Sequence, residues 1–543
     1  MSKIKKVLAL VLTMAMVLGM AVTSFAASDA TLKKGTGTAT DTGSITVNGI
    51  EKENGISVKA YKIIEAKYEN GSKFSRYNSL YPTIVSNQDI VDGNWETSAK
   101  LASILDDIVA KQTPGSEMTL TDTKNGDKDY YVASLADVAV GSYLVVVSGA
   151  DNKIYSPVVV SVSYASKDNG TDIGIDEGTV NIESGNAWIK VSTNPVLDKK
   201  IVEGDNRVSH NTVNIGDVVS YELTTTIPYY GGNHPVFNIV DTLDGLTYKA
   251  GSLEVKANGE KLEKGKAYTL SPADDQITST MTIDFVVNGN YTLNSYQGKT
   301  LTITYKATVN DNAHINQDAN TNTATLNYTK DSKVTGKDAS DTKKTYTYTY
   351  DIDAAVNGSV TNNIITKYGK DSNNTKVKLP GAVFTLYKDS ACSTVYTNHV
   401  FTGTVTTDDN GQMPIKGLEG NKTYYLKETK APDNYTLNNT VYEITINEEA
   451  YDAQGRVTKW SITVNGDTIA SQDGIKSEFN ITYANEDVAT ITPDKNEAEI
   501  INTKISSLPS TGGIGTTIFT IGGCAIMIVA AGLFFATRRK TQK

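Results

Sequence analysis

Residues 301–309 read LTITYKATV, and apolar or aromatic side chains alternate with polar ones along the whole run. A period of two is the pattern of a β-strand with one buried face. The same pattern, rich in Val, Ile, Thr and Tyr and bounded by Asn, Gly and Asp, recurs along the chain. Further examples are residues 44–50, 156–164, 344–353 and 423–428. We therefore expect a mainly β chain, built as a string of antiparallel β-sandwiches.

Helical periodicity is scarce in this sequence. The best candidate is residues 98–112, SAKLASILDDIVAKQ, in which Leu101, Ile104, Leu105 and Ile108 fall on one helical face. We expect one amphipathic helix there.

Both ends of the chain carry membrane signals. Residues 1–26 combine a basic start, an apolar core and a small-residue site, which predicts a secretory signal peptide cleaved after Ala26 or Ala27. Residues 514–536 carry no charge and are long enough to cross about 30 Å of hydrocarbon. Basic residues at 538–540 follow, which places the extreme C-terminus in the cytoplasm. We expect an exported ectodomain that is held by its tail.

The length of the ectodomain predicts about three domains. We place them at residues 27–187, 188–353 and 354–505, with a separate C-terminal segment at 506–543. The formal net charge is −10, and no basic stripe is present that could neutralise phosphates. We therefore expect no nucleic-acid partner.

Cysteine use raises a question about stability. The chain has two cysteines, Cys392 in the ectodomain and Cys524 in the apolar segment near the C-terminus. A lone ectodomain thiol cannot form a disulfide within the chain, although exported proteins commonly use disulfides. Either the domains have ample cores, or another crosslink stabilises them.

Other chemistry has little support in the sequence. The four histidines lack metal-ligand spacing, and no nucleophile–base motif is visible. The acidic loop around Asp127 is interleaved with lysines, which argues against a calcium site. We expect no metal and no cofactor.

The C-terminal segment contains the most specific motif. Leu508, Pro509, Ser510, Thr511 and Gly512 precede the apolar span and the basic tail. This arrangement resembles the cell-wall sorting signal of Gram-positive surface proteins. The resemblance implies that a sortase cleaves between Thr511 and Gly512 and transfers the Thr carbonyl to an amine. Pro509 fixes an extended, kinked peptide, and Gly512 leaves room at the scissile bond.

A second motif lies at residues 424–437, YYLKETKAPDNYTL. It resembles the E-box of Gram-positive pilins and related B-type collagen-adhesin domains, which are immunoglobulin-like β-sandwiches. In that family the Glu promotes an amide bond between a Lys on the first strand and an Asn on the last. The resemblance, with the strand parity of each residue, assigns Lys367 and Asn502 as partners and Glu428 as the promoting acid.

The chemistry of such a bond follows from burial. An apolar core lowers the pKa of a Lys, which becomes a neutral nucleophile, and raises the pKa of a carboxyl, which keeps its proton. The acid can then polarise the Asn carbonyl and relay protons while ammonia leaves. Such a crosslink would answer the cysteine question, because reduction cannot break it.

The second domain carries a looser version of the same set. PVLDKKI offers Lys199 or Lys200 on a first strand, and both strand parity and the family resemblance favour Lys199. FNIVDTLDGLTY resembles the segment that carries the catalytic Asp of the A-type collagen-adhesin fold. That resemblance points to Asp241.

The asparagine partner in the second domain has two candidates. ANTNTATLNYT resembles the closing strand of the A-type fold, in which Asn322 is favoured and Asn320 is the alternate on the same face. The family often has Tyr-Ser-Asn after this strand, whereas Tyr328, Thr329 and Lys330 stand here.

The amine that receives the sortase product is expected near the start of the second domain. Backbone pilins carry it in a motif that runs Trp, Val, then Tyr-Pro-Lys. Trp188 and Val191 are present here, but residues 192–195 read STNP instead. Lys190 is the best candidate acceptor, and an ordinary strand lysine is the competing interpretation.

These resemblances imply a structural shaft subunit of a pilus, without turnover on a substrate. Its expected partners are a pilus sortase, other copies of the chain, peptidoglycan, and possible minor pilins and host surface ligands. The alternative is a monomeric wall-anchored adhesin that binds a host protein or glycan.

Overall fold

The computed structural model describes most of the region between the two membrane signals, together with the C-terminal helix. The signal-peptide segment and the motif Leu508, Pro509, Ser510, Thr511 and Gly512 lie outside the described residues. The described residues are 37–71, 73–126, 128–164, 175–176, 179–180, 182–231, 235–315, 318–330, 338–356, 359–363, 365–371, 373–473, 498–504 and 514–540.

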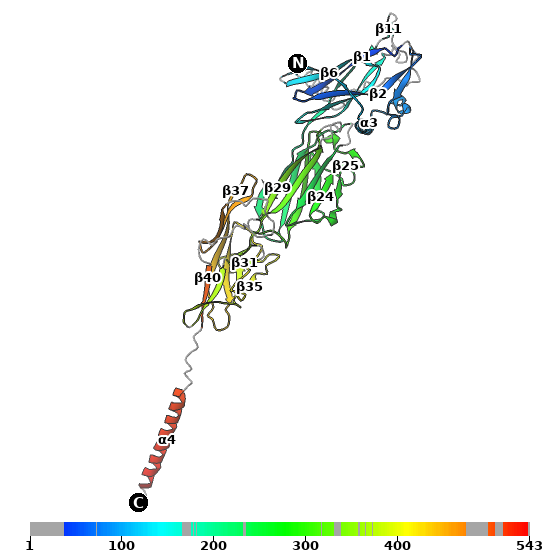
Figure 1. Ribbon diagram of the computed structural model, residues 1–543. Helices are drawn as coiled ribbons and strands as arrows, with labels where there is room; N and C mark the ends of the chain where they lie inside the picture. Colours follow the sequence, from blue (N-terminus) through cyan, green and yellow to red (C-terminus); the bar gives the residue numbers. More distant parts are fainter. Residues whose placement is uncertain are drawn as a thin grey trace, which may run out of the picture. The chain divides into compact units, whose positions relative to one another are not determined.

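The chain divides into two compact units, and strands dominate both (Figure 1). The first contains two groups of sheets, and the second contains one group followed by a helix. The mainly β prediction is therefore confirmed. The three domain ranges given above stay a prediction. The first unit comprises residues 1–211, 216–314 and 318–348, and the second comprises 212–215, 315–317 and 349–543.

The first sheet group pairs a four-stranded sheet with a six-stranded sheet across an apolar core. Ile45, Val47 and Leu144 lie in this core with no exposed surface. The smaller sheet has the order β13–β1–β6–β5, with β1 (Thr42–Glu51), β5 (Thr119–Asn125), β6 (Lys128–Ala139) and β13 (Gly185–Trp188). The larger has the order β12–β9–β7–β2–β3, with β4 paired to β2; its strands are β2 (Ser57–Glu69), β3 (Lys73–Ser79), β4 (Ser116–Glu117), β7 (Gly141–Ser148), β9 (Val158–Tyr164) and β12 (Ile182–Glu183).

Two helices accompany this group, α2 (Asn87–Val91) and α3 (Ser98–Ala110). The expected face of α3 is buried, and the side chain of Thr97 caps its first turn by accepting from the Lys100 N–H. The helix predicted for residues 98–112 is confirmed and ends two residues early.

The second sheet group also consists of two sheets. The first has the order β16–β15–β18–β27–β21–β22, with β20 paired to β27; the second has the order β17–β29–β28–β19–β24–β23. The strands of the first are β15 (Asp198–Glu203), β16 (Asn206–Val208), β18 (Val218–Thr226), β20 (Leu246–Tyr248), β21 (Glu254–Ala257), β22 (Glu260–Lys261) and β27 (Thr300–Val309). Those of the second are β17 (His210–Thr212), β19 (Phe237–Leu243), β23 (Thr269–Ser271), β24 (Thr280–Asp284), β28 (Asn320–Thr329) and β29 (Asp338–Tyr348).

The strand that carries Asn322 is not the last of this group. β29 follows β28 and pairs with it in antiparallel register along ten residue pairs. The likeness of β28 to the closing strand of the A-type fold therefore does not extend to its place in this group, because β29, which overlaps the strand expected at residues 344–353, follows it.

The third sheet group lies in the second unit. A three-stranded sheet has the order β33–β32–β40, and a six-stranded sheet has the order β35–β34–β36–β37–β38–β39. The strands of the first are β32 (Ile365–Lys370), β33 (Lys376–Lys378) and β40 (Ala498–Thr503). Those of the second are β34 (Val383–Tyr387), β35 (Thr404–Thr406), β36 (Lys422–Lys430), β37 (Val441–Tyr451), β38 (Val457–Val464) and β39 (Asp467–Asp473).

Short elements complete the chain. Four two-stranded pairs are β8 (Lys153–Tyr155) with β14 (Val191–Thr193), β10 (Ile175–Asp176) with β11 (Thr179–Val180), β25 (Val286–Val287) with β26 (Asn290–Tyr291), and β30 (Asp353–Val356) with β31 (Ser359–Asn363). Two 3-10 turns are η1 (Asp274–Gln276) and η2 (Asn294–Tyr296).

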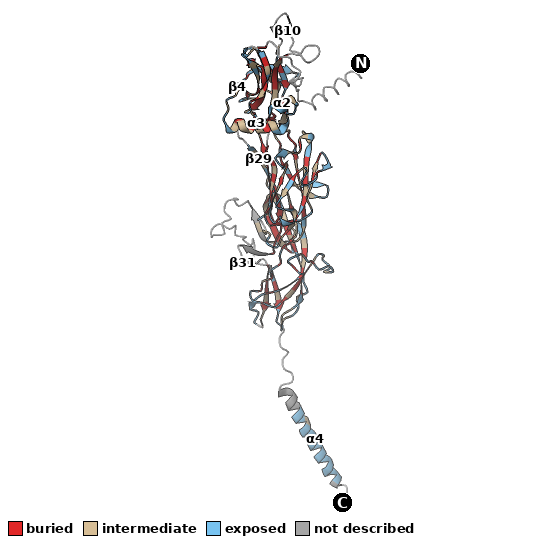
Figure 2. Cartoon of the chain, turned by 90° about the vertical axis from the view of Figure 1, so that its right-hand side faces the viewer, coloured by how far each residue is buried: buried red, intermediate tan, exposed pale blue. Residues whose placement is uncertain are grey.

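The C-terminal helix α4 (Ile514–Lys540) differs from the rest of the molecule in burial. Residues 520–538 are long and apolar enough to cross a membrane, and they bury nothing against the protein (Figure 2). A soluble helix would bury an apolar face, so this helix fits the expected membrane anchor.

Buried polar residues are distributed unevenly among the three groups. In the described part of the first group, the buried polar side chains are four serines at 79, 142, 156 and 161. In the second and third groups they include lysine, aspartate, glutamate and asparagine. Since burying a charged group is costly without a partner, those positions mark the candidate sites.

Candidate crosslink sites

One buried polar cluster lies in the third sheet group. Lys367 on β32 and Asn502 on β40 come from parallel neighbouring strands, with Gly369 directly opposite Asn502. The two side chains are therefore offset by two residues along the strands and lie on the same face of the sheet. Glu428 comes from β36 in the other sheet. All three are at most 1% exposed.

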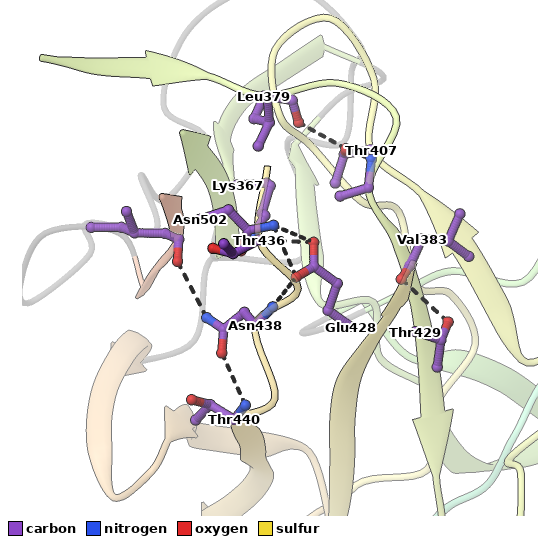
Figure 3. A network of polar contacts seen from close by, with 12 residues as sticks. Lys367, Leu379, Val383, Thr407, Glu428, Thr429, Thr436, Asn438, Thr440 and Asn502 are labelled. Carbon is purple, nitrogen blue, oxygen red and sulfur yellow. Dashed lines mark hydrogen bonds and ion pairs between the residues drawn. The ribbon is translucent and has the colours of Figure 1, made fainter. Parts of the chain in front are cut away.

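The three side chains contact one another directly (Figure 3). The Lys367 Nζ donates to the Asn502 Oδ1 and lies 3.4 Å from the Glu428 Oε1. The Asn502 Nδ2 donates to both Glu428 oxygens, at 2.8 and 3.0 Å. The backbone N–H of Asn438 donates to the Glu428 Oε2 at 2.8 Å and so orients the carboxylate.

Burial shapes the chemistry of this lysine. It lowers the pKa of Lys367 to about 8, and the nearby Glu428 opposes part of that shift. The phenyl ring of Phe384 lies 5.6 Å from the Nζ and helps to form the apolar wall. The amine is therefore more readily neutral, and hence nucleophilic, than an exposed lysine.

A second cluster lies between the two sheets of the second group. Lys199 on β15 belongs to one sheet, whereas Asp241 on β19 and Asn322 on β28 belong to the other. The Lys199 Nζ lies 2.9 and 2.7 Å from the two Asp241 oxygens. Burial lowers the pKa of Lys199 to about 8 against the opposing effect of Asp241.

A tyrosine that we did not predict completes this cluster. Tyr305 on β27 is 1% exposed, and its Oη accepts from the Lys199 Nζ at 2.9 Å and from the Asn322 Nδ2 at 2.6 Å. It donates to the Asp241 Oδ2 at 2.6 Å. The alternation in LTITYKATV already places Tyr305 on the buried face. Only the pairing of the strands brings its hydroxyl to these partners.

The geometry separates the competing residues of the second group. Lys199 is buried, whereas Lys200 points outward, with its Nζ 3.7 Å from the Asp198 Oδ1. Asn320 is also buried, but its side chain is bonded to the backbone, with its Oδ1 on the His314 N–H and its Nδ2 on the carbonyls of His314 and Thr347. Asn322, by contrast, faces the reactive groups.

Comparisons with known proteins agree with this organisation. The model of the Gram-positive pilin backbone subunit 2, Cna-B-like domain, matches residues 215–332. The SpaA prealbumin-like fold domain matches residues 365–459, and the LPXTG cell wall anchor motif matches residues 501–543. The trypsin-resistant surface T6 protein of Streptococcus pyogenes serotype M6 is 27% identical over 554 residues, which cover 92% of this chain and 95% of that protein.

The chain carries a Gram-positive pilin backbone domain and an LPXTG anchor, the domain set of a backbone pilin. The middle segment, which we compared with the A-type collagen-adhesin fold, matches a model described as Cna-B-like. The anchor motif and the apolar helix α4 make this pilin a cell wall-anchored surface protein.

Solved structures of pilins are similar to this one. The T6 backbone pilin of serotype M6 Streptococcus pyogenes has a TM-score of 0.45 and 22% identity, and covers 76% of this chain and 83% of its own. The full-length major pilin SpaD from Corynebacterium diphtheriae has a TM-score of 0.43 and 19% identity, and covers 86% and 98%.

The candidate acceptor of this pilin lies between β13 and β14. Lys190 is half-buried, and its Nζ lies 4.2 Å from the centre of the Tyr229 ring. Its backbone carbonyl accepts from the Ser156 N–H at 3.1 Å. Trp188, two residues earlier, is 61% exposed. The lysine is thus held at the point where the first sheet group ends.

The described residues of this pilin contain no group of three or more His, Cys, Asp or Glu side chains that could hold a metal ion. Among those same residues, Cys392 is half-buried and free.

Proposed function

We propose that this pilin is a shaft subunit of a sortase-assembled pilus, and that two intramolecular Lys–Asn amide bonds stabilise it. One joins Lys367 to Asn502 beside Glu428, and the other joins Lys199 to Asn322 beside Asp241. The observation that carries the proposal is that a buried lysine, carboxylate and asparagine meet twice, in separate sheet groups, with no exposed side chain among the six.

The reaction is a condensation within each cluster. The neutral lysine Nζ attacks the asparagine Cγ, so the Nζ–Cγ bond forms and the Cγ–Nδ2 bond breaks. The proton that the Nζ loses passes through the carboxyl group to the departing nitrogen, which leaves as ammonia. The fold supplies proximity: Lys367 and Asn502 are already in contact, and Lys199 and Asn322 both contact the hydroxyl of Tyr305. Each bond forms once per molecule, so no substrate is turned over.

Such a bond would stabilise the chain by restraining its unfolded state. Lys367 and Asn502 are 135 residues apart. By the chain-entropy model used for disulfides, closing a loop of that length contributes about 5 kcal/mol. Unlike a disulfide, the amide is insensitive to reducing agents.

Assembly would use the C-terminal motif and an amine of another copy. A sortase would cleave between Thr511 and Gly512 and join the Thr511 carbonyl to Lys190 of the next subunit. The last subunit would be transferred to peptidoglycan. The anchor match and the family support this sequence of steps, and the position of Lys190 at the end of the first sheet group suits an acceptor.

Intact-mass measurement of the mature ectodomain tests the crosslinks. We expect a mass about 34 Da below the sequence mass, or about 17 Da for each ammonia lost. E428A and K199A should each restore about 17 Da, because each disables one cluster. K200A is the matched control for K199A, since the neighbouring side chain points outward, and it should keep both losses. An unshifted wild-type mass would refute the proposal.

Polymerisation is tested separately in the producing cell. Wild-type cell-wall extracts should give a ladder of high-mass species that resist SDS, and K190R should abolish it. A ladder that survives K190R would exclude Lys190 as the acceptor. One discrete wild-type band would instead favour the monomeric adhesin.

A further inference from the structure

The two clusters differ in how the carboxylate reaches the asparagine. In the third sheet group, both Glu428 oxygens contact the Asn502 Nδ2 directly. In the second, the acid is Asp241, whose side chain is one methylene shorter. There the hydroxyl of Tyr305 lies between the two groups, 2.6 Å from the Asp241 Oδ2 and 2.6 Å from the Asn322 Nδ2.

We propose that Tyr305 is a catalytic residue of the second cluster, which relays a proton from Asp241 to the departing amide nitrogen of Asn322. This inference rests on the proposed crosslink between Lys199 and Asn322. It assigns to Tyr305 the part that the longer Glu428 performs alone in the third sheet group.

The contacts allow the proton transfers to balance. When the Lys199 Nζ attacks the Asn322 Cγ, the new Nζ–Cγ bond leaves a surplus proton on the Nζ. That proton passes to Asp241, whose oxygens lie 2.9 and 2.7 Å away. Asp241 gives a proton to the Tyr305 Oη, and the Tyr305 Oη gives its own to the Nδ2. The Cγ–Nδ2 bond then breaks and ammonia leaves, while Asp241 and Tyr305 return to their starting states.

The surroundings of Tyr305 fix its hydroxyl in this position. Its ring stacks on Tyr221 with centroids 5.4 Å apart and planes at 28°, and it packs against Tyr248 at 6.1 Å. A rigid, buried ring keeps the Oη within reach of three reacting groups at once. Such preorganisation is what a proton relay requires.

The test follows the two mass losses in the unlinked ectodomain as it is refolded from inclusion bodies. In Y305F, we expect one loss of about 17 Da at the normal rate and the other slowed about 100-fold or more. Peptide mapping should assign the surviving bond to Lys367 and Asn502. Y248F is the matched control, because its ring packs on Tyr305 but its Oη donates to Asp274. It should keep both losses at the wild-type rate.

A double variant separates the relay from a packing effect. In D241E/Y305F, the longer acid should contact the Asn322 amide directly, in the space that the phenol oxygen vacates, and the second loss should return. A folded double variant without that loss would overturn the relay.

If Y305F does not fold, a tyrosine analogue that keeps the phenol hydroxyl provides a second test. 3,5-Difluorotyrosine placed at position 305 has a more acidic phenol, so it should change the rate of the second loss only. An unchanged rate would overturn the proposal, as would two normal losses in folded Y305F. Wild-type protein without any loss would instead refute the crosslinks themselves.

Discussion

The two buried lysines lie in surroundings that oppose a positive charge. Each is enclosed by strands of two sheets, and for each the pKa falls to about 8, while an adjacent carboxylate opposes the fall. An exposed lysine has a pKa near 10.4 and is almost fully protonated at neutral pH. With the lower pKa, a larger fraction of each lysine amine is neutral, and hence nucleophilic, at neutral pH.

Crosslink formation should depend on pH for this reason. When the unlinked ectodomain is refolded from inclusion bodies, the rate of mass loss should rise about tenfold per unit between roughly pH 6 and 8 and level off above. The sign follows from the lowered pKa values, since only the neutral amine attacks. N322A/N502A should show no loss at any pH. A rate that is flat across this interval would contradict the role assigned to the amines.

The two candidate asparagines of β28, Asn320 and Asn322, should respond differently to removal. N322A should lose one ammonia-sized mass difference. N320A should still lose that ammonia. It should lower the free energy of unfolding by about 1–3 kcal/mol, because the backbone N–H and carbonyl of His314 lose their hydrogen bonds to the Asn320 side chain. Intact mass and chemical denaturation measure the two effects. The reverse result would identify Asn320 as the crosslink residue.

At the scale of elements, the two proposed bonds connect different kinds of neighbours. In the third sheet group, β32 and β40 already pair in one sheet, and β40 lies at its edge. In the second group, β15 and β28 belong to opposite sheets. One bond would therefore secure an edge strand, and the other would hold two sheets together.

Hydrogen exchange should reveal the exposed position of β40. In N502A, the amides of residues 498–503 should exchange faster than in the wild type, since the strand is then held by its hydrogen bonds to β32 and to the segment around Thr436, without a covalent link. K378A is a suitable control, because Lys378 is exposed on β33, which pairs with β32 on the side away from β40. Equal protection of β40 in N502A and wild type would show that the bond adds nothing to its stability.

Much of this arrangement could be predicted from strand parity and motifs. Alternation placed Lys367, Asn502 and Lys199 on buried faces, and the E-box located Glu428. Two features could not be predicted from the sequence. A strand was expected at residues 344–353, but its pairing with β28 was not, because a strand pattern does not say which strand it pairs with. The contacts of Tyr305 depend on strands that pair far apart in sequence, so parity could show its burial but not its partners.

At the scale of the molecule, stability would come from crosslinks that no reductant affects. Loss of both bonds in D241A/E428A should lower the melting temperature of the mature ectodomain by about 10 °C or more, from several kcal/mol of lost restraint per bond. Adding dithiothreitol should leave the wild-type melting curve unchanged, since the one described ectodomain thiol, Cys392, is free. Differential scanning calorimetry measures both. A melting temperature that falls with dithiothreitol would point to an intermolecular disulfide instead.

The first sheet group, whose described buried polar side chains are serines, differs from the other two groups in the load that it would carry within a fibre. With Lys190 as the acceptor, tension in a fibre would enter each subunit at residue 190 and leave at Thr511. Every covalent path between those points runs through the second and third sheet groups. Residues 37–188 precede residue 190 and are therefore not part of that path. The part of the chain without a lysine–asparagine pair in its described core is then the part that carries no force, and its surface is free to vary without weakening the fibre.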